Sequence, residues 1–200
     1  MTDTYKTIEA ESQGYFKDKG SKFLAFLYPV KSEDEIKQII LQIKKEHHSA
    51  RHHCYAWRLG TDNITWRAND DGEPSSTAGK PILGQLQSFE ITQALLVVVR
   101  YFGGTLLGVS GLINAYRNAA ADALNNAHII ERIIEDEYFL DFTYNELNDV
   151  MLIIKQENLT IIKTWFEEKC RILFSVRKSE AEKVEQIFQN FYGVNLSKNN

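Results

Sequence analysis

Cysteine, long apolar runs and excess positive charge are all scarce in this 200-residue chain. Its two cysteines, Cys54 and Cys170, lie far apart with no Cys-x-x-Cys pair, which excludes a disulfide framework and indicates a reducing compartment. The longest apolar run, Ala94–Val99, is far shorter than the roughly 18 residues that a membrane helix needs. The N-terminal segment MTDTYKTIEAES has no apolar stretch, so we expect no signal peptide, no membrane association and a cytoplasmic protein.

The 23 lysines and arginines are outnumbered by 27 acidic residues, which gives a formal net charge of -4. Residues 1–130 balance 14 basic against 14 acidic residues, so the whole excess lies in residues 131–200, with 9 against 13. This excludes a strongly basic nucleic-acid-binding protein but leaves room for a basic patch on the neutral part. With 44% hydrophobic and 25% charged residues, the composition is that of a globular protein.

Strand and helix patterns alternate through the first 130 residues. Residues 4–9 and 22–30 have strand patterns, and Ser32–Glu35 reads as a capping box before a helix with Ile36, Ile39, Ile40 and Ile43 on one face. A hairpin is predicted around residues 60–63, between strands His53–Leu59 and Ile64–Arg67. A buried strand, Ala94–Phe102, leads into a glycine loop and a helix capped by Ser110, whose inner face carries Leu112, Tyr116, Ala120, Ala123 and Ala127.

The charged stretch Glu131–Glu137 is expected to mark a domain boundary. Beyond it, the pattern predicts the order βαββα with a short final strand, which is typical of a ferredoxin-like sheet with helices on one face. Its elements are a strand at Tyr138–Tyr144, a helix capped by Asn145 with Leu147, Val150, Met151 and Ile154 inside, strands near 159–166 and 170–176, a Ser179/Glu182 capping box, a helix ending at Gly193, and a strand at Val194–Leu196.

Carboxylates, hydroxyls and a lysine crowd the segment from Asp70 to Pro81. One interpretation is a turn followed by a helix capped by Ser75 or Ser76, with the acidic residues favoured near the positive end of the helix. The other is a ligand site, because exposed helix N–H groups, hydroxyls and Lys80 together could hold a phosphate. Catalysis is the third and least favoured alternative.

The segment Arg100–Gly111 runs from a buried strand through glycines into a helix, a place where backbone N–H groups can approach a phosphate closely. Gly103 and Gly108 have P-loop spacing, but Val109 occupies the position of the P-loop lysine, which argues against nucleotide hydrolysis. The context of Ser110 also misses the nucleophile-elbow pattern of serine hydrolases. The loop therefore predicts a docking surface made by backbone groups.

Four of the five histidines cluster beside a thiol, at His47, His48, His52 and His53 next to Cys54. On an alternating strand, His53 should point away from His52 and Cys54, so that too few ligands converge for zinc. We expect no metal site here, and a cysteine nucleophile lacks a residue to orient its histidine.

Three motifs, ARHHCYAW, DDGEPSSTAGKPIL and the run from Gly79 to Gly108, follow one another in this order. In these motifs the chain closely resembles the YigZ/IMPACT family over nearly its whole length. The resemblance implies an α+β protein with two domains. Residues 1–130 would form an IMPACT-type domain with the left-handed βαβ crossover found in ribosomal proteins, and residues 136–200 a ferredoxin-like domain.

The family's eukaryotic namesake regulates translation initiation by competing for the activator of a stress kinase. The resemblance therefore implies a translation-associated protein whose N-terminal domain contacts RNA or a ribosomal component, with protein–protein regulation of translation as the alternative. It implies no cofactor, and nothing in the sequence supports the peptidase label that some members carry. A small-molecule enzyme using Asp70, Asp71, Glu73, Ser75, Lys80 and His52 in one cleft is the least favoured alternative.

This chain departs from the family pattern in its glycine loop, where Leu106 and Asn114 occupy positions that are commonly basic. Regulation through a protein partner would need an exposed apolar patch, with Tyr101 or Trp57 as candidate anchors. No catalytic residue or metal ligand is assigned. The residues expected to bind RNA or another ligand are Lys22, His52, Asp70, Asp71, Glu73, Ser75, Ser76, Lys80, Arg100, Gly103, Gly104, Gly108, Ser110 and Arg117.

Overall fold

The structure, a computed structural model, describes residues 3–199 of an α+β chain, as predicted. The chain divides into two compact units, the first spanning Tyr5–Arg132 and the second residues 133–199 together with Asp3 and Thr4. The expected domains 1–130 and 136–200 include residues 1, 2 and 200, which lie outside the described part. No helix within residues 3–199 is both long and apolar enough to cross a membrane.

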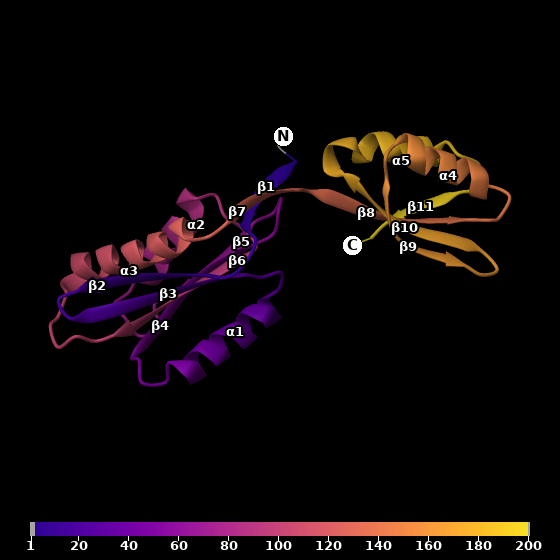
Figure 1. Ribbon diagram of the computed structural model, residues 1–200. Helices are drawn as coiled ribbons and strands as arrows, with labels where there is room; N and C mark the ends of the chain where they lie inside the picture. The colour runs from indigo at the N-terminus through magenta and orange to yellow at the C-terminus, as the bar shows by residue number, and fades with distance from the viewer. Residues whose placement is uncertain (1–2, 200) are drawn as a thin grey trace. The chain divides into compact units, whose positions relative to one another are not determined.

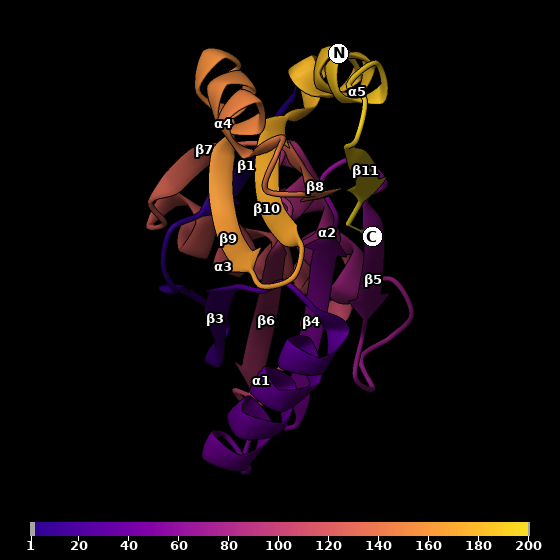
Figure 2. The same ribbon diagram turned by 90° about the vertical axis from the view of Figure 1, so that its right-hand side faces the viewer.

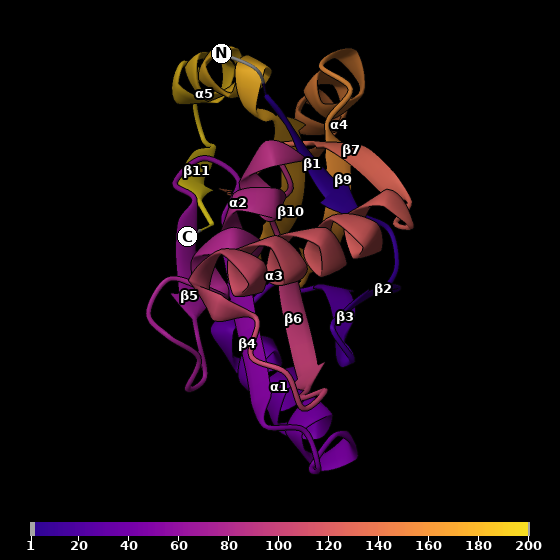
Figure 3. The same cartoon turned by 90° about the vertical axis from the view of Figure 1, so that its left-hand side faces the viewer.

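The first unit is built on a five-stranded antiparallel sheet with the order β2-β3-β6-β4-β5, beside a separate pair formed by β1 and β7. Figure 1 shows α1 on one face of the five-stranded sheet and α2 with α3 on the other, and Figures 2 and 3 view these two faces. The elements are β1 Thr4–Ile8, β2 Ser12–Asp18, β3 Ser21–Pro29, α1 Glu33–Glu46, β4 His52–Leu59, β5 Thr65–Asn69, α2 Gly79–Ser88, β6 Ala94–Tyr101, α3 Gly108–Asn125 and β7 Ile129–Ile133.

The central strand β6 explains the longest apolar run of the sequence. Residues Ala94–Val99 are fully buried because helices cover both faces of the sheet. Leu96 and Val98 pack with α2 and α3, whereas Leu95, Val97 and Val99 pack on the α1 side. A strand covered on both sides reads as a continuous hydrophobic segment rather than an alternating one.

The capping box before α1 is confirmed, with one change of partner. Ser32 Oγ accepts a hydrogen bond from the Glu35 N–H at 3.2 Å, and the Glu35 carboxylate accepts one from the Lys31 N–H at 2.7 Å rather than from the N–H of Ser32. The predicted hairpin of β4 and β5 is also confirmed. The Ser110 cap is wrong, because α3 already begins at Gly108, with Leu107 at its N-cap and no capping side chain.

Strand β2 was not predicted, although its hairpin carried a signal. Lys19 and Gly20, the two residues between β2 and β3, both have positive φ, at 42° and 82°, as the tight turns of β-hairpins require. Gly14 then allows β2 to lie against the alanine-rich face of α3, where a Cβ atom would come within 2.2 Å of the Ala123 nitrogen. The strand therefore depends on small residues in two distant segments.

The second unit has a four-stranded antiparallel sheet with the order β11-β8-β10-β9. Helices α4 and α5 cover one of its faces (Figure 1), and Val150, Ile154, Val184 and Phe188 are buried there. Its elements are β8 Glu135–Phe142, α4 Leu147–Gln156, β9 Thr160–Phe166, β10 Cys170–Arg177, a short 3₁₀ turn Lys178–Glu180, α5 Ala181–Gln189 and β11 Asn195–Lys198.

Several predicted helix ends in this unit are wrong. The N-caps are Glu146 and Glu180 rather than Asn145 and Ser179, and neither helix has a side-chain cap. Helix α5 ends at Gln189, four residues before Gly193, and Met151 is 39% exposed rather than inside. The two starts differ because the chain enters each helix through a turn that leaves the predicted capping residue outside the helix.

We predict that Gly14→Ala destabilises the first unit, because the new methyl group would meet the backbone of α3 at 2.2 Å and 2.8 Å. Overpacking of this kind costs about 1–3 kcal/mol of the free energy of unfolding, measurable by urea denaturation. Gly84→Ala is the matched control, because nothing lies within 4 Å of its Cβ position in α2. This control should gain about 0.5–1 kcal/mol, and equal effects of the two substitutions would contradict the packing argument.

Candidate functional site

Many of the predicted site residues meet at the end of the sheet where β3 and β4 begin and β6 ends. Lys22 pairs across the strands with Tyr101, and His52 pairs with Arg100. The loop after β6 (Figure 3) touches the β2–β3 hairpin so closely that a Cβ on Gly103 would lie 1.9 Å from the Gly20 carbonyl carbon. The glycine is required there because two backbones are in contact.

Asp70 holds the start of α2. Its Oδ1 accepts hydrogen bonds from the N–H groups of Ala78 and Gly79 at 3.0 and 2.8 Å, and its Oδ2 accepts one from Ser76 at 2.9 Å. The predicted cap by Ser75 or Ser76 is therefore wrong, since α2 begins at Gly79 and Asp70 supplies the acceptor from outside the helix. Backbone N–H groups at a helix start need such an acceptor.

Asp71 ties the same loop to α1 and β4. Its carboxylate accepts hydrogen bonds from Lys44 Nζ at 2.9 Å and from the His53 N–H at 2.7 Å. Burial alone would raise the pKa of Asp71, but these two hydrogen bonds outweigh it, so that the pKa lies below its ordinary value. Asp70 and Asp71 are thus engaged in holding the loop in place.

Glu73 lies at the centre of a buried polar network. Its Oε1 accepts hydrogen bonds from Arg100 Nη1 at 2.6 Å and from the Tyr116 hydroxyl at 2.8 Å, and His52 Nε2 lies 3.9 Å away. Cys54 Sγ lies 3.3 Å from the Tyr116 oxygen, and burial raises the pKa of this thiol far above its ordinary value. Such a thiol is not a reactive nucleophile.

Above this network is a cavity of about 340 Å³. Its inner lining combines the polar residues His52, Glu73 and Arg100 with the buried Leu107 and Leu112, and Phe102, Leu106 and Val109 are exposed around it. The remaining lining residues are Arg51, Pro74 and Gly108. The loop around Glu73 and the glycine loop therefore share one face.

Among the predicted residues, His52, Glu73, Arg100 and Gly108 line this cavity. Lys22 instead lines a neighbouring hollow of about 530 Å³, with Tyr15, Gly20, Leu24, Tyr101 and Phe102. Asp70 and Asp71 lie in the loop beneath, and the remaining predicted residues line neither space: Ser75, Ser76, Lys80, Gly103, Gly104, Ser110 and Arg117. Only two of the six groups proposed for an enzyme cleft, His52 and Glu73, share the cavity.

Sequence reasoning did not assign Arg51, Phe102 or Tyr116 to the site. The Phe102 ring lies between two guanidinium groups, 5.8 Å from that of Arg51 and 5.6 Å from that of Arg100. The position of Phe102, directly after a buried strand and before two glycines, was the sequence feature that could have indicated its place in the site. The helical spacing places Tyr116 on the inner face of α3, and the structure confirms this, since its ring packs on Phe23 while its hydroxyl reaches Glu73.

His53 points to the opposite side of β4 from His52 and Cys54, as predicted, and its Nε2 lies 3.1 Å from the His47 carbonyl oxygen. Among residues 3–199, no cluster of three or more histidine, cysteine or acidic side chains has a geometry that could hold a metal ion.

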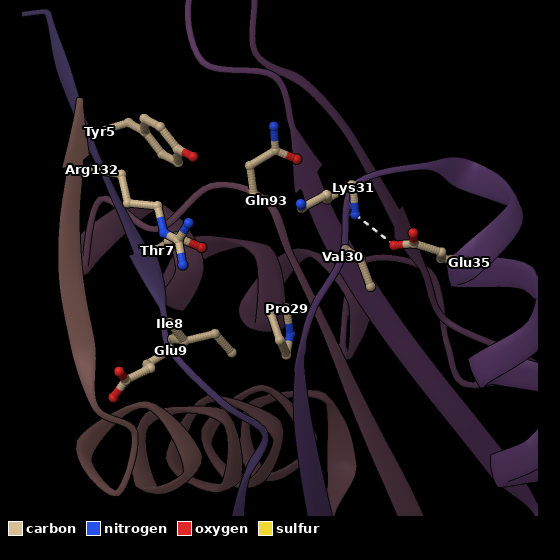
Figure 4. A pocket seen from close by; sticks show the side chains of 10 residues that line it. All are labelled: Tyr5, Thr7, Ile8, Glu9, Pro29, Val30, Lys31, Glu35, Gln93 and Arg132. Carbon is tan, nitrogen blue, oxygen red and sulfur yellow. Dashed lines mark hydrogen bonds between the residues drawn. The ribbon is translucent and has the colours of Figure 1, made fainter. Parts of the chain in front are cut away.

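A larger cavity of about 580 Å³ lies elsewhere in the first unit, between the β1–β7 pair and the segment from β3 to α1. Figure 4 shows Arg132 and Thr7 on one wall and Lys31 and Glu35 on the other. None of the predicted site residues lines it. Its charged side chains are of both signs, which gives no preference for an anionic or a cationic ligand.

We predict that Asp70→Ala lowers the free energy of unfolding by about 1–3 kcal/mol, because it leaves backbone N–H groups at the start of α2 without an acceptor. Asp70→Asn keeps the oxygen that serves Ala78 and Gly79 and loses only the acceptor for Ser76, so its loss should be smaller. Urea unfolding of both variants measures the difference. Equal losses would show that the hydrogen bonds to Oδ1 are not the stabilising ones.

The chain is similar to known proteins over most of its length. Residues 19–124 match the Impact N-terminal domain. The chain is 35% identical over 186 residues to the IMPACT family member YvyE of Bacillus subtilis, with 88% of this chain and 85% of the relative covered. It is 35% identical over 151 residues to YigZ of Escherichia coli, with 74% of each chain covered. A crystal structure of a hypothetical protein superimposes with a TM-score of 0.72 at 28% identity, covering 100% of this chain and 99% of the other. The chain therefore belongs to the IMPACT family, as its motifs predicted.

Proposed function

We propose that this protein is a translation-associated binding protein of the cytoplasm that contacts RNA, in the ribosome or free, through its first unit. The observation that carries the proposal is the hollow beside Lys22, where three aromatic rings, Tyr15, Tyr101 and Phe102, line one space with a lysine. Single-stranded nucleic acid binds to such surfaces because bases stack on aromatic rings while cations contact the phosphates.

The charges around the hollow favour a polyanion. Lys17 pairs across the strands with Lys22, Lys19 lies in the same hairpin, and Arg51 lies over Phe102. We call Lys17, Lys19, Lys22 and Arg51 the basic surface. All four side chains are exposed. Asp18, between Lys17 and Lys19, supplies one negative charge against the three lysines of this hairpin. A local basic surface on a unit with balanced charge is sufficient for phosphate contacts.

Family membership supports the link to translation, since the resemblance implies regulation of translation for the eukaryotic members. It also supports the finer description of the fold. Strands β3 and β4 both run antiparallel to β6, which lies between them, so β3-α1-β4 is a crossover connection. We propose from the family resemblance that this crossover is the left-handed one. We also propose that the second unit is ferredoxin-like, since its order β11-β8-β10-β9, with α4 and α5 as connections, is the split βαβ arrangement.

A protein partner at the same end is the second candidate, and one observation favours it. Leu106, Val109 and Phe102 are 83%, 59% and 43% exposed, so they form an apolar patch beside Arg51. Trp57 is not the anchor that was expected, because it is only 6% exposed. A protein partner would bind this patch with little dependence on salt, whereas RNA binding weakens steeply as salt is added.

We predict that Lys22→Glu weakens binding of a labelled single-stranded RNA about tenfold, because one phosphate contact is lost. The slope of the logarithm of affinity against the logarithm of salt concentration should fall by about one.

Tyr15→Ala should weaken binding of the same RNA by about 1–3 kcal/mol if a base stacks on the Tyr15 ring. Fluorescence anisotropy at two salt concentrations measures both effects. Lys169→Glu, an exposed lysine of the second unit, is the control and should leave the affinity unchanged. Absence of RNA binding at low salt, together with no co-sedimentation with ribosomes, would contradict the proposal.

A further inference from the structure

The cavity above Glu73 contains an unsatisfied buried donor. Arg100 is only 6% exposed, and its Nη1 is hydrogen-bonded to Glu73, but its Nε has no hydrogen-bond partner within residues 3–199. An unpaired buried N–H normally costs free energy, so native structures rarely keep one without a reason. Arg100 also lines the cavity, so an anion bound there would lie against a buried guanidinium group with unused hydrogen-bonding capacity.

The positive end of a long helix points to the same ligand chemistry. Helix α3 has 18 residues and no side-chain cap at its start, and its first two residues, Gly108 and Val109, line the cavity. The first N–H groups of a helix have no partner within the helix and favour a negative charge. Helix starts of this kind bind phosphate in many proteins.

The net charge at the cavity is positive despite its glutamate. Glu73 is compensated by Arg100 at 2.6 Å, which leaves Arg51 and the start of α3 to determine the field. His52 Nδ1 lies 2.9 Å from the Asp71 carbonyl oxygen, which can only accept, so Nδ1 carries the proton.

The rim adds an apolar surface to this anion site. Phe102, Leu106 and Val109 are exposed around the opening, and the Phe102 ring is the largest of them. A volume of about 340 Å³ is at the lower end of the range of about 300–1,000 Å³ for small-molecule sites. The space is therefore suited to one phosphate with one flat apolar group attached.

We propose that this cavity binds a single nucleotide, with the phosphate at Arg51, Arg100 and the start of α3 and the base against Phe102 and Leu106. This inference deepens the proposed function, because the nucleotide can be free or can be one unit of a bound RNA strand. It differs from the hollow beside Lys22, which has no buried unsatisfied donor among the described residues that line it.

The test is a titration of the full-length ¹⁵N-labelled protein, followed through the amide signals of Gly103, Gly104, Gly108 and Gly111. The probes are adenosine 5′-monophosphate, adenosine, and single-stranded oligoadenylate. The monophosphate and the oligonucleotide should shift these signals, and adenosine should bind about tenfold more weakly because it lacks the charge-assisted hydrogen bonds. Equal affinity for adenosine and its monophosphate would overturn the phosphate assignment.

Leu106 provides a matched pair of variants that leave the fold intact, because its side chain is 83% exposed. Both substitutions remove the apolar contact of Leu106 with the base, so the difference between them reports the charge alone, and the monophosphate should bind several-fold more tightly to Leu106→Lys than to Leu106→Glu. Arg51→Gln should weaken binding of the monophosphate about tenfold, and Lys169→Gln, in the second unit, should not change it. No effect of either charge at position 106 would overturn the proposal.

The outcomes separate this site from the proposed function. Oligonucleotide binding that is weakened by Lys22→Glu but leaves the Gly108 and Gly111 signals unmoved would overturn the nucleotide site and leave RNA binding intact. Binding of the monophosphate without any binding of the oligonucleotide would support the nucleotide site as one for a free nucleotide and contradict the RNA proposal. Shifts with the oligonucleotide alone would contradict the nucleotide site, because binding in the hollow beside Lys22 would also move the neighbouring Gly103 and Gly104 signals.

Discussion

The contact between Glu73 and Arg100 is the interaction on which the candidate site depends. Both side chains are more than nine-tenths buried, and they join three segments: the loop before α2, the central strand β6 and, through Tyr116, helix α3. Removing two charges from water is costly, and a buried pair is retained only when the geometry and further hydrogen bonds compensate. Here the Tyr116 hydroxyl supplies one such bond, and the Phe23 and Phe102 rings lie against the guanidinium.

Hydrogen bonds from α1, α2, β4 and β6 hold the loop of residues 70–78 in place. Asp70 and Asp71 are adjacent carboxylates, a pattern that catalytic acids can share. In the structure, however, Asp70 accepts hydrogen bonds from backbone N–H groups, and Asp71 accepts them from Lys44 and the His53 N–H. Carboxylates held in this way orient the loop and leave Glu73 in the lining of the cavity. A fixed loop of this kind suits recognition, because little conformational entropy is lost when a ligand binds.

The positive charge at this end of the molecule comes from a few residues, since the unit as a whole has balanced charge. Lys22, Arg51, the Arg100 guanidinium and the uncapped start of α3 all lie around Phe102. Leu106 and Val109 add exposed apolar surface beside these positive groups. A site for an inorganic anion alone would gain nothing from such a surface. The combination of phosphate-binding groups and a flat apolar rim is what distinguishes a nucleotide from a free inorganic anion.

The sequence by itself determined the α+β class, the central strand, the α1 capping box, the hairpin of β4 and β5 and the family, because each depends on local periodicity or on an ordered set of motifs. Only the tertiary structure decided which polar residues serve the site. Ser75, Ser76 and Ser110 have the right chemistry for caps, but Asp70 reaches α2 across the loop and α3 starts before Ser110. Strand β2, the role of the Tyr116 hydroxyl and the position of Phe102 between two arginines depend on contacts between segments far apart in the chain. No local pattern encodes such contacts, because packing rather than propensity brings those segments together.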